Sequence, residues 1–213
     1  MRQVRLGQTN LQVSVIAFGT WAFGGDWGDA DLQESKDTIH HALELGINLF
    51  DTAQGYGFGA AEQLLAEALR ERTSREEVII ATKGGLRMDG DRLLRDASRR
   101  WLREGLESSL RNLGTDYIDL YQVHWPDLHA PPEETAAALE ELVGEGRSAT
   151  LVCPTTTPTR CKRSAMSGGW KRCSRRITCS AGKSRQRSCP IPPSTTSACW
   201  FTGRWPMVCS RVG

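Results

Sequence analysis

The sequence predicts an α/β fold: an incomplete (β/α)8 barrel, preceded by an N-terminal β-hairpin and followed by a disordered basic tail rich in Cys, Ser and Arg. From Leu11 to about residue 146, short β-branched or apolar runs alternate with longer amphipathic segments, as in strand–helix units around a parallel sheet. Four such units follow one another, which indicates half of a barrel, although a doubly wound sheet fits the same pattern. After Gly146 neither the strand period nor the helix period continues.

The elements follow from local patterns taken in order. Residues 1–14 hold two short β-prone runs around a Gly-Gln-Thr-Asn turn, which predicts the hairpin. Apolar residues recur at helical spacing in the longer segments, glycines follow two of these segments, and acidic residues open the last one. The strands are expected at 15–18, 47–50, 78–81 and 117–123, and the helices at 31–45, 59–70, 92–113 and 132–143.

Charge and cysteine content divide the chain into two parts. All 25 acidic residues lie in residues 1–146, while 13 of the 27 Lys and Arg and all 7 cysteines lie in residues 147–213. We therefore expect one barrel-forming part, residues 1–146, and a tail, residues 147–213, that has no stable fold. A front part without cysteine is typical of the reducing cytoplasm, and no stretch resembles a signal peptide or a membrane span. The sequence thus predicts a cytoplasmic protein with no membrane partner.

Reactive side chains follow three of the predicted strands. Asp51 and Tyr56 come after the strand at 47–50, Lys83 comes after the next strand, and His124 comes after the fourth. Since the carboxyl ends of parallel barrel strands meet at one rim, we expect the four side chains to lie together. Each alone is compatible with a structural role, such as a turn cap or a buried histidine, so the prediction rests on their combination.

The combination suits the reduction of a carbonyl group. Hydride addition leaves an alkoxide that needs a proton, and a phenol supplies one near neutral pH only if its pKa, ordinarily about 10, is lowered. We expect Lys83 to lower the pKa of Tyr56 and Asp51 to hold Lys83 in place. His124 can donate a hydrogen bond to the carbonyl oxygen, where negative charge develops.

Several motifs resemble those of the aldo/keto reductase family. They are Phe50-Asp51-Thr52-Ala53-Gln54-Gly55-Tyr56-Gly57, Ala81-Thr82-Lys83-Gly84-Gly85, Tyr121-Gln122-Val123-His124-Trp125 and the opening Phe18-Gly19-Thr20-Trp21. The resemblance implies NAD(P)H-dependent reduction of a small aldehyde or ketone to an alcohol on a (β/α)8 barrel. It implies Tyr56 as the proton donor, Asp51 and Lys83 as the groups that tune it, and His124 as the group that orients the carbonyl.

The same resemblance implies where a cofactor would bind. The nicotinamide end would lie against Gly19, Thr20, Trp21 and Asp51, and the cofactor would be NADP(H), with NAD(H) as the alternative. Some proteins that resemble this family act as cofactor-sensing regulatory subunits, so a non-catalytic regulatory or binding subunit is the alternative to an enzyme. The sequence predicts neither the particular carbonyl substrate nor the oligomeric state.

A Rossmann-type dinucleotide site is a competing interpretation. Residues 55–60 fit the G-x-G-x-x-A pattern between a predicted strand and a predicted helix. A Rossmann unit also needs an acid at the end of the next strand to bind the ribose, and that position holds Lys83. The pattern therefore disfavours this interpretation.

The tail is compatible with the same gene read in the wrong frame. With one A restored before codon 147, synonymous codons for residues 147–164 encode KIRHIGVSNYNPDAMQAF, and the run from Trp170 to Ser180 can restore ETLQPPYHLF. The first string contains IGVSN, which resembles the fifth strand of an aldo/keto reductase barrel, and the second resembles a later cofactor-binding region. We therefore expect a frameshift and a truncated barrel. Because part of the cofactor-binding site is then missing, we expect a chain that is inactive or nearly so.

Two other functions of the tail are disfavoured. The last four cysteines recur every ten residues, but residues 147–213 contain no C-x-x-C pair and no histidine, so we expect no metal site. The 13 positive charges of the tail, together with its tryptophans, would bind nucleic acid without specificity. No specific nucleic-acid partner is therefore expected.

Overall fold

The computed structural model describes residues 1–7, 9–25 and 31–148 in full. Of the later chain it describes only the backbone of four short strands, β9 (Leu151–Val152), β10 (Arg176–Thr178), β11 (Ser197–Trp200) and β12 (Val208–Arg211). The prediction that residues 147–213 have no stable fold falls mostly outside the described residues. It stays a prediction.

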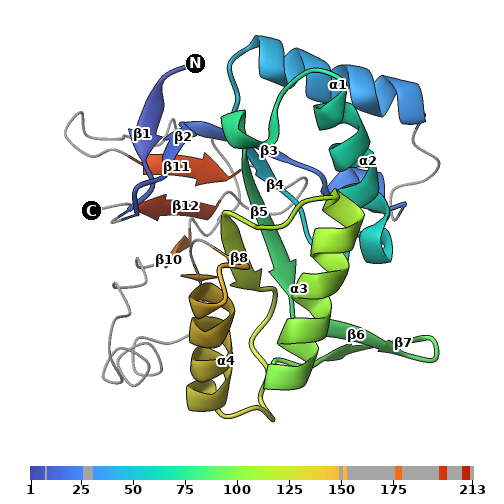
Figure 1. Ribbon diagram of the computed structural model, residues 1–213, viewed down its shortest axis with the longest axis vertical. Helices are drawn as coiled ribbons and strands as arrows, with labels where there is room; N and C mark the ends of the chain where they lie inside the picture. The colour runs from blue at the N-terminus through green and yellow to red at the C-terminus, as the bar shows by residue number, and fades with distance from the viewer. Residues whose placement is uncertain are drawn as a thin grey trace, which may run out of the picture.

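The chain begins with the predicted hairpin, in which β1 (Gln3–Arg5) pairs with β2 (Gln12–Ser14) in antiparallel register. Strands and helices then alternate (Figure 1). The elements are β3 (Ile16–Gly19), α1 (Leu32–Glu44), β4 (Leu49–Asp51), α2 (Ala60–Arg70), β5 (Ile79–Gly84), α3 (Arg99–Leu113), β8 (Leu120–Val123) and α4 (Pro132–Gly144). Three short 3-10 helices, η1 (Trp21–Gly24), η2 (Gly57–Gly59) and η3 (Arg75–Glu77), lie in the connections.

The strands of these units form one parallel sheet in chain order. β3 pairs with β4, β4 with β5, β5 with β8 and β8 with β9, all in parallel. A doubly wound sheet would reverse its strand order at a switch point, whereas the sequential order here is that of a barrel. On the other side of β3 the sheet continues with β11, β12 and β10. The fold is therefore the predicted incomplete (β/α)8 barrel.

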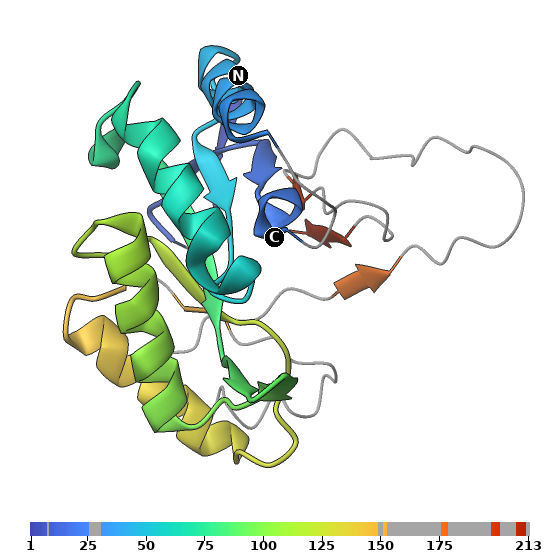
Figure 2. The ribbon, with the colours of Figure 1, turned by 90° about the vertical axis from the view of Figure 1, so that its right-hand side faces the viewer.

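Helices α2, α3 and α4 lie on one side of the central strands, as Figure 2 shows. Their apolar faces form the main core with the strands, because apolar residues recur every three or four positions along each helix. On α2 the buried side chains include Leu64, Leu65, Ala68 and Leu69, the face that the sequence predicts. The core cluster also contains Leu102, Leu106, Leu110, Leu113, Leu139, Leu142, Ile80 and Val123.

The predicted helix at 92–113 is wrong in its first part. Residues before Arg99 instead form a second hairpin, in which β6 (Leu86–Asp89) pairs with β7 (Arg92–Arg95). Its two-residue turn has glycine in the first place, and Gly90 has a φ of 59°, the conformation that such tight hairpin turns need. The helix starts only after Ser98, where Asp96 accepts a hydrogen bond from the Ser98 N–H at 3.2 Å.

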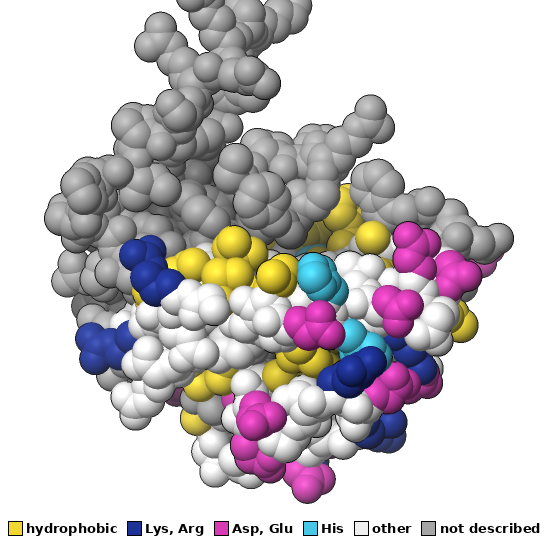
Figure 3. Space-filling view, turned by 90° about the horizontal axis from the view of Figure 1, so that it is seen from above, with side chains coloured by type: hydrophobic (Ala, Val, Ile, Leu, Met, Phe, Trp, Pro, Cys, Tyr) yellow, Lys and Arg dark blue, Asp and Glu magenta, His cyan; other side chains and the backbone are white. Residues whose placement is uncertain are grey.

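Figure 3 views the molecule from above, the end at which α1 lies in Figure 1. Acidic, basic and histidine side chains are interspersed on its described part. Ion pairs also join α1 to the end of α2: Lys36 Nζ lies 3.2 Å from Glu67 Oε2 and 3.0 Å from Glu71 Oε1. Within the described ranges, none of the helices has the length and hydropathy that crossing a lipid bilayer requires.

Candidate active site

Three adjacent strands bring the predicted site residues to one rim. Asp51 is the last residue of β4, Lys83 lies near the end of β5, and His124 directly follows β8. Backbone hydrogen bonds fix the loops beyond the strands: the Gln54 N–H donates to the Lys83 carbonyl at 3.0 Å, and the His124 N–H donates to the Gly84 carbonyl at 2.9 Å. The structure therefore brings together all four residues that the sequence singles out.

A buried ion pair forms the centre of the site. Lys83 Nζ lies 2.7 Å from Asp51 Oδ1 and also donates to the Thr52 carbonyl at 2.8 Å. Burial raises the pKa of the Asp51 carboxyl above its ordinary value, and the positive charge of Lys83 opposes this effect. Burial alone would lower the pKa of Lys83, but the attraction of Asp51 and Tyr56 outweighs it and raises that pKa. Lys83 is therefore an ammonium ion held in place by a carboxylate.

The phenol of Tyr56 lies beside this ammonium group. Lys83 Nζ donates to Tyr56 Oη at 3.4 Å and lies 5.1 Å from the centre of the ring. Burial nevertheless raises the pKa of Tyr56, and the charge of Lys83 offsets only part of the rise. The expectation that Lys83 brings the pKa of Tyr56 below its ordinary value is therefore wrong, because removal of the phenol from water is the larger effect.

His124 completes the group from the side of β8. Its ring meets the Tyr56 ring edge to face, with 5.5 Å between the centres and an angle of 84°. Burial, with a smaller contribution from the charge of Lys83, lowers the pKa of His124 to about 4. At neutral pH the imidazole is thus uncharged, carries one N–H, and can donate a hydrogen bond without adding a second positive charge.

The segment expected to face a nicotinamide lies next to Asp51. Gly19 pairs in register with Asp51, and the buried Thr20 donates its N–H to the Asp51 carbonyl at 3.0 Å. Trp21 begins η1 directly afterwards. Two buried polar atoms in the site region, Thr52 Oγ1 and His124 Nδ1, have no hydrogen-bond partner within the described part of the chain. Gly19, at the exposed end of β3, leaves backbone beside Asp51 open to the polar end of a cofactor.

Comparison with known proteins identifies the family. A family model, Aldo/keto reductase family, matches residues 15–152. The chain belongs to the aldo/keto reductase family. It is 46% identical over 148 residues to the aldo-keto reductase YhdN of Bacillus subtilis, covering 69% of this chain and 45% of that protein. It is 42% identical over 163 residues to the NADH-specific methylglyoxal reductase of Escherichia coli, covering 69% and 50%.

A further relative and a solved structure extend the comparison. A probable voltage-gated potassium channel subunit beta of Arabidopsis thaliana is 34% identical over 150 residues, covering 68% of this chain and 44% of that protein. The structure of a glycerol dehydrogenase from Gluconobacter oxydans superposes with a TM-score of 0.70 at 34% identity, covering 78% of this chain and 52% of that one. The chain thus spans about half the length of the aldo/keto reductases that it matches.

Sequence reasoning missed one apolar neighbour of the candidate site. Leu86, at the start of β6, packs on the bare backbone before Tyr56. A Cβ at Gly55 would lie only 2.9 Å from Leu86 Cδ1 and 3.8 Å from His124 Nδ1. The second hairpin, part of which the sequence predicts as helix, therefore forms one side of the site. The turn-forming pair Gly90-Asp91 is the sequence signal for it, whereas the flanking runs consist mostly of Leu, Arg and Met, which favour helices.

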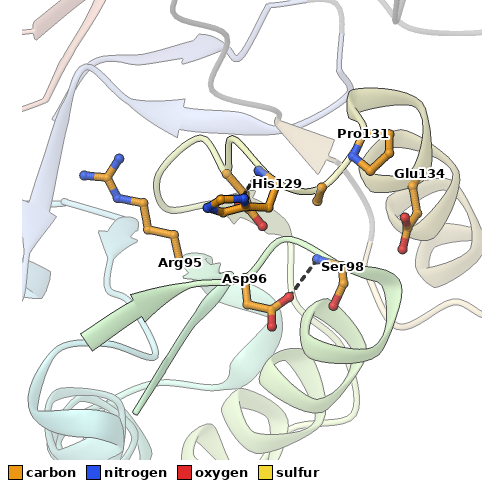
Figure 4. A pocket seen from close by; sticks show the side chains of 8 residues that line it. Arg95, Asp96, Ser98, His129, Pro131 and Glu134 are labelled. Atoms are coloured by element: carbon orange, nitrogen blue, oxygen red, sulfur yellow. Dashed lines mark hydrogen bonds between the residues drawn. The ribbon is translucent and has the colours of Figure 1, made fainter. Parts of the chain in front are cut away.

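A cavity of about 320 Å³ lies where α3 and α4 begin (Figure 4). Its acidic side chains already bind backbone N–H groups. Asp127 accepts from the Ala97 N–H at 3.0 Å and from the His129 N–H at 2.8 Å, and Glu134 accepts from the Arg99 N–H at 3.4 Å. These contacts indicate that the side chains around the cavity fix the starts of the two helices.

Proposed function

We propose that this chain carries the proton-delivering part of an active site for NAD(P)H-dependent reduction of aldehydes or ketones to alcohols. The observation that carries the proposal is the contact between Tyr56 Oη and Lys83 Nζ at 3.4 Å, with Asp51 Oδ1 2.7 Å behind the ammonium. A phenol, an ammonium and a carboxylate in this order form a proton donor with a cation fixed beside it.

Each of the four site residues has a separate role in the proposed reduction. A bound nicotinamide cofactor would supply the hydride to the carbonyl carbon. Tyr56 gives its hydroxyl proton to the carbonyl oxygen, and the phenolate that remains is stabilised by the ammonium of Lys83. Asp51 keeps Lys83 charged and in place, and the neutral His124 donates an N–H to the carbonyl oxygen and so orients the substrate.

The same proposal covers the cofactor and the substrate class. Gly19, Thr20, Trp21 and Asp51 would hold the nicotinamide end, in line with the position of the exposed strand end beside Asp51. We propose NADP(H) by family resemblance, with NAD(H) as the alternative, which the name of the E. coli relative supports. The substrate would be a small carbonyl compound, and the protein would act in the cytoplasm.

We further propose that residues 1–146 are the barrel part and that residues 147–213 are out of frame, so that this chain is inactive or nearly so. The abrupt change of charge at residue 146 and the end of the family match at residue 152 support this. The strands beyond that point in a complete family member would supply the remaining residues that bind the cofactor. Without them the hydride source is not held beside Tyr56.

The test compares two products of one gene. The first is this chain, and the second is the chain encoded after insertion of one A before codon 147. Each is assayed for oxidation of NADPH and of NADH with a panel of small aldehydes and ketones, methylglyoxal among them. We expect turnover only from the restored chain, and its loss on Tyr56→Phe. Saturable turnover by the present chain that Tyr56→Phe abolishes would refute its inactivity. A folded restored chain without turnover would refute the reductase proposal.

A non-catalytic regulatory or binding subunit is the second candidate, favoured by the similarity to the relative named as a potassium channel subunit beta. It predicts that residues 1–146, used as bait, retain a specific partner chain while neither product of the gene reduces a carbonyl. Turnover by the restored chain without a retained partner would exclude this candidate.

A further inference from the structure

The 3-10 helix η1 packs on the loop of Tyr56 through bare backbone. A Cβ built at Gly24 would lie 2.9 Å from the Gly57 nitrogen, 3.0 Å from the Tyr56 carbonyl carbon and 3.2 Å from Tyr56 Cα. From the other side, a Cβ at Gly57 would lie 2.6 Å from the Gly24 carbonyl oxygen. The two segments therefore touch along their main chains, with no side chain between them that could yield.

Glycine at position 24 is explained by this contact and not by backbone conformation. Gly57 has a φ of 59°, which by itself favours glycine, whereas the φ of Gly24 lies outside the left-handed range. Alanine at position 24 would consequently be unstrained in its own backbone. Its only cost would be the displacement of the Tyr56 loop.

The same segment is attached to the other half of the site. Thr20, the residue before η1, donates its N–H to the Asp51 carbonyl at 3.0 Å and directs its hydroxyl to the same oxygen at 3.4 Å. Asp51 in turn holds Lys83 at 2.7 Å. η1 is thus attached to Asp51 through Thr20, and a methyl group at Gly24 would push the Tyr56 backbone away from this segment. We expect the phenol to follow its backbone and so to move away from the Asp51–Lys83 pair.

We propose that Gly24 is a positioning residue: its bare backbone sets how closely the hydroxyl of Tyr56 approaches the ammonium of Lys83. The inference rests on the proposed function only in treating Tyr56 as the proton donor. It adds that the segment expected to face the nicotinamide also fixes the proton donor, so cofactor site and acid are positioned by one stretch of chain.

The test is the Gly24→Ala variant, followed by titration of Tyr56. The protein is labelled with carbon-13 at the tyrosine ζ position, which gives 3 signals for the 3 tyrosines, and the Tyr56 signal is assigned with Tyr56→Phe. Relief of the 2.9 Å contact to an ordinary 3.4 Å moves the loop by about half an ångström. At an effective dielectric constant of about 20, that displacement lowers the ratio of phenolate to phenol about threefold at a given pH.

The matched control is Gly144→Ala, because a Cβ at Gly144 meets no atom within 4 Å. It should leave the Tyr56 titration unchanged. Tyr121 is the internal control, since it lies in the core and should not respond in either variant. If Gly24→Ala alone does not fold, the double variant Gly24→Ala/Gly144→Ala takes its place, because alanine at position 144 improves the helix propensity of α4. Tyr56 is then titrated in this double variant at low temperature.

A Tyr56 titration that is unchanged in folded Gly24→Ala, or that shifts toward lower pH, would overturn the proposal. So would the appearance of a titration of Tyr121, whose burial raises its pKa, because it would indicate general loosening of the core. The measurement involves no turnover, so it separates the two proposals. A shifted Tyr56 in a protein whose restored form has no reductase activity would support the positioning role while refuting the proposed function.

Discussion

Replacing Lys83 by methionine tests the ion pair at the centre of the site. Methionine keeps an apolar stem of similar length but removes the ammonium, so Asp51 Oδ1 loses its partner at 2.7 Å. The Asp51 side chain is only 5% exposed, so little water can replace that partner. Leaving one charge of a buried pair without its partner ordinarily costs about 3–5 kcal/mol of folding free energy.

The structure sets an upper limit on this loss, because Asp51 can take up a proton. Protonating a carboxyl whose ordinary pKa is 3.8 at pH 7 costs roughly 4 kcal/mol, at about 1.36 kcal/mol for each pH unit. We therefore expect Lys83→Met to reduce the free energy of unfolding by up to about 4 kcal/mol at pH 7.

The pH dependence gives the sharper test. Burial raises the pKa of Asp51 in the folded protein, and without Lys83 nothing opposes the rise. A carboxyl with a raised folded pKa stabilises the fold most below its unfolded pKa, and this contribution is lost as the pH rises through the folded value. The deficit of Lys83→Met should thus be small near pH 4 and grow toward pH 7.

Urea unfolding followed by circular dichroism measures the loss of unfolding free energy at pH 7 and at pH 4. The control is the double variant Asp51→Asn/Lys83→Met, which leaves no charge buried and should recover part of the loss at pH 7. A loss below about 1 kcal/mol at pH 7, or an equal loss at both pH values, would show that the pair is not the buried, coupled contact described above.

Three further outcomes are expected. The ring protons of His124 should titrate near pH 4 in an NMR pH series, since burial and Lys83 lower its pKa to about 4; a midpoint near 6.5 would contradict this. Gly84→Ala should lose about 1–3 kcal/mol in urea unfolding, since its methyl group would overlap the Tyr121 hydroxyl; wild-type stability would contradict that contact. Leu139→Ala, at a position with 0% exposure, should lose about 2–5 kcal/mol. Leu128→Ala, at 75% exposure, should change stability by less than about 0.5 kcal/mol, and equal losses for the two would refute the packing of α4.

The position of the site could be predicted from the sequence, because one topological rule is sufficient for it. Parallel strands place their carboxyl ends at one rim, so Asp51, Lys83 and His124 meet once their strands are recognised. Tyr56 follows because its loop begins at Asp51. The main apolar faces were also predictable, as Leu65 and Leu69 on α2 illustrate.

Features that depend on packing between distant segments could not be predicted in this way. The pKa of Tyr56 is raised because burial outweighs the neighbouring charge, and burial is a property of the assembled fold. The contact of Gly24 with the Tyr56 loop joins two connections that follow different strands, so no local pattern indicates it. The second hairpin escapes prediction for another reason: the helical pattern that truly begins at Arg99 can be extended backward toward the turn at Gly90.

The raised pKa of Tyr56 is compatible with its proposed role and assigns a specific part to Lys83. A phenol whose pKa lies above its ordinary value is fully protonated at neutral pH, so the donor always carries the proton that the reaction needs. The difficulty arises when the proton leaves, since a buried phenolate is then formed. Lys83, 3.4 Å away, attracts this phenolate far more strongly than it attracts the neutral phenol. Its stabilisation therefore grows as the proton is transferred, so in a complete active site the loss of Lys83 should slow the chemical step more than it weakens substrate binding.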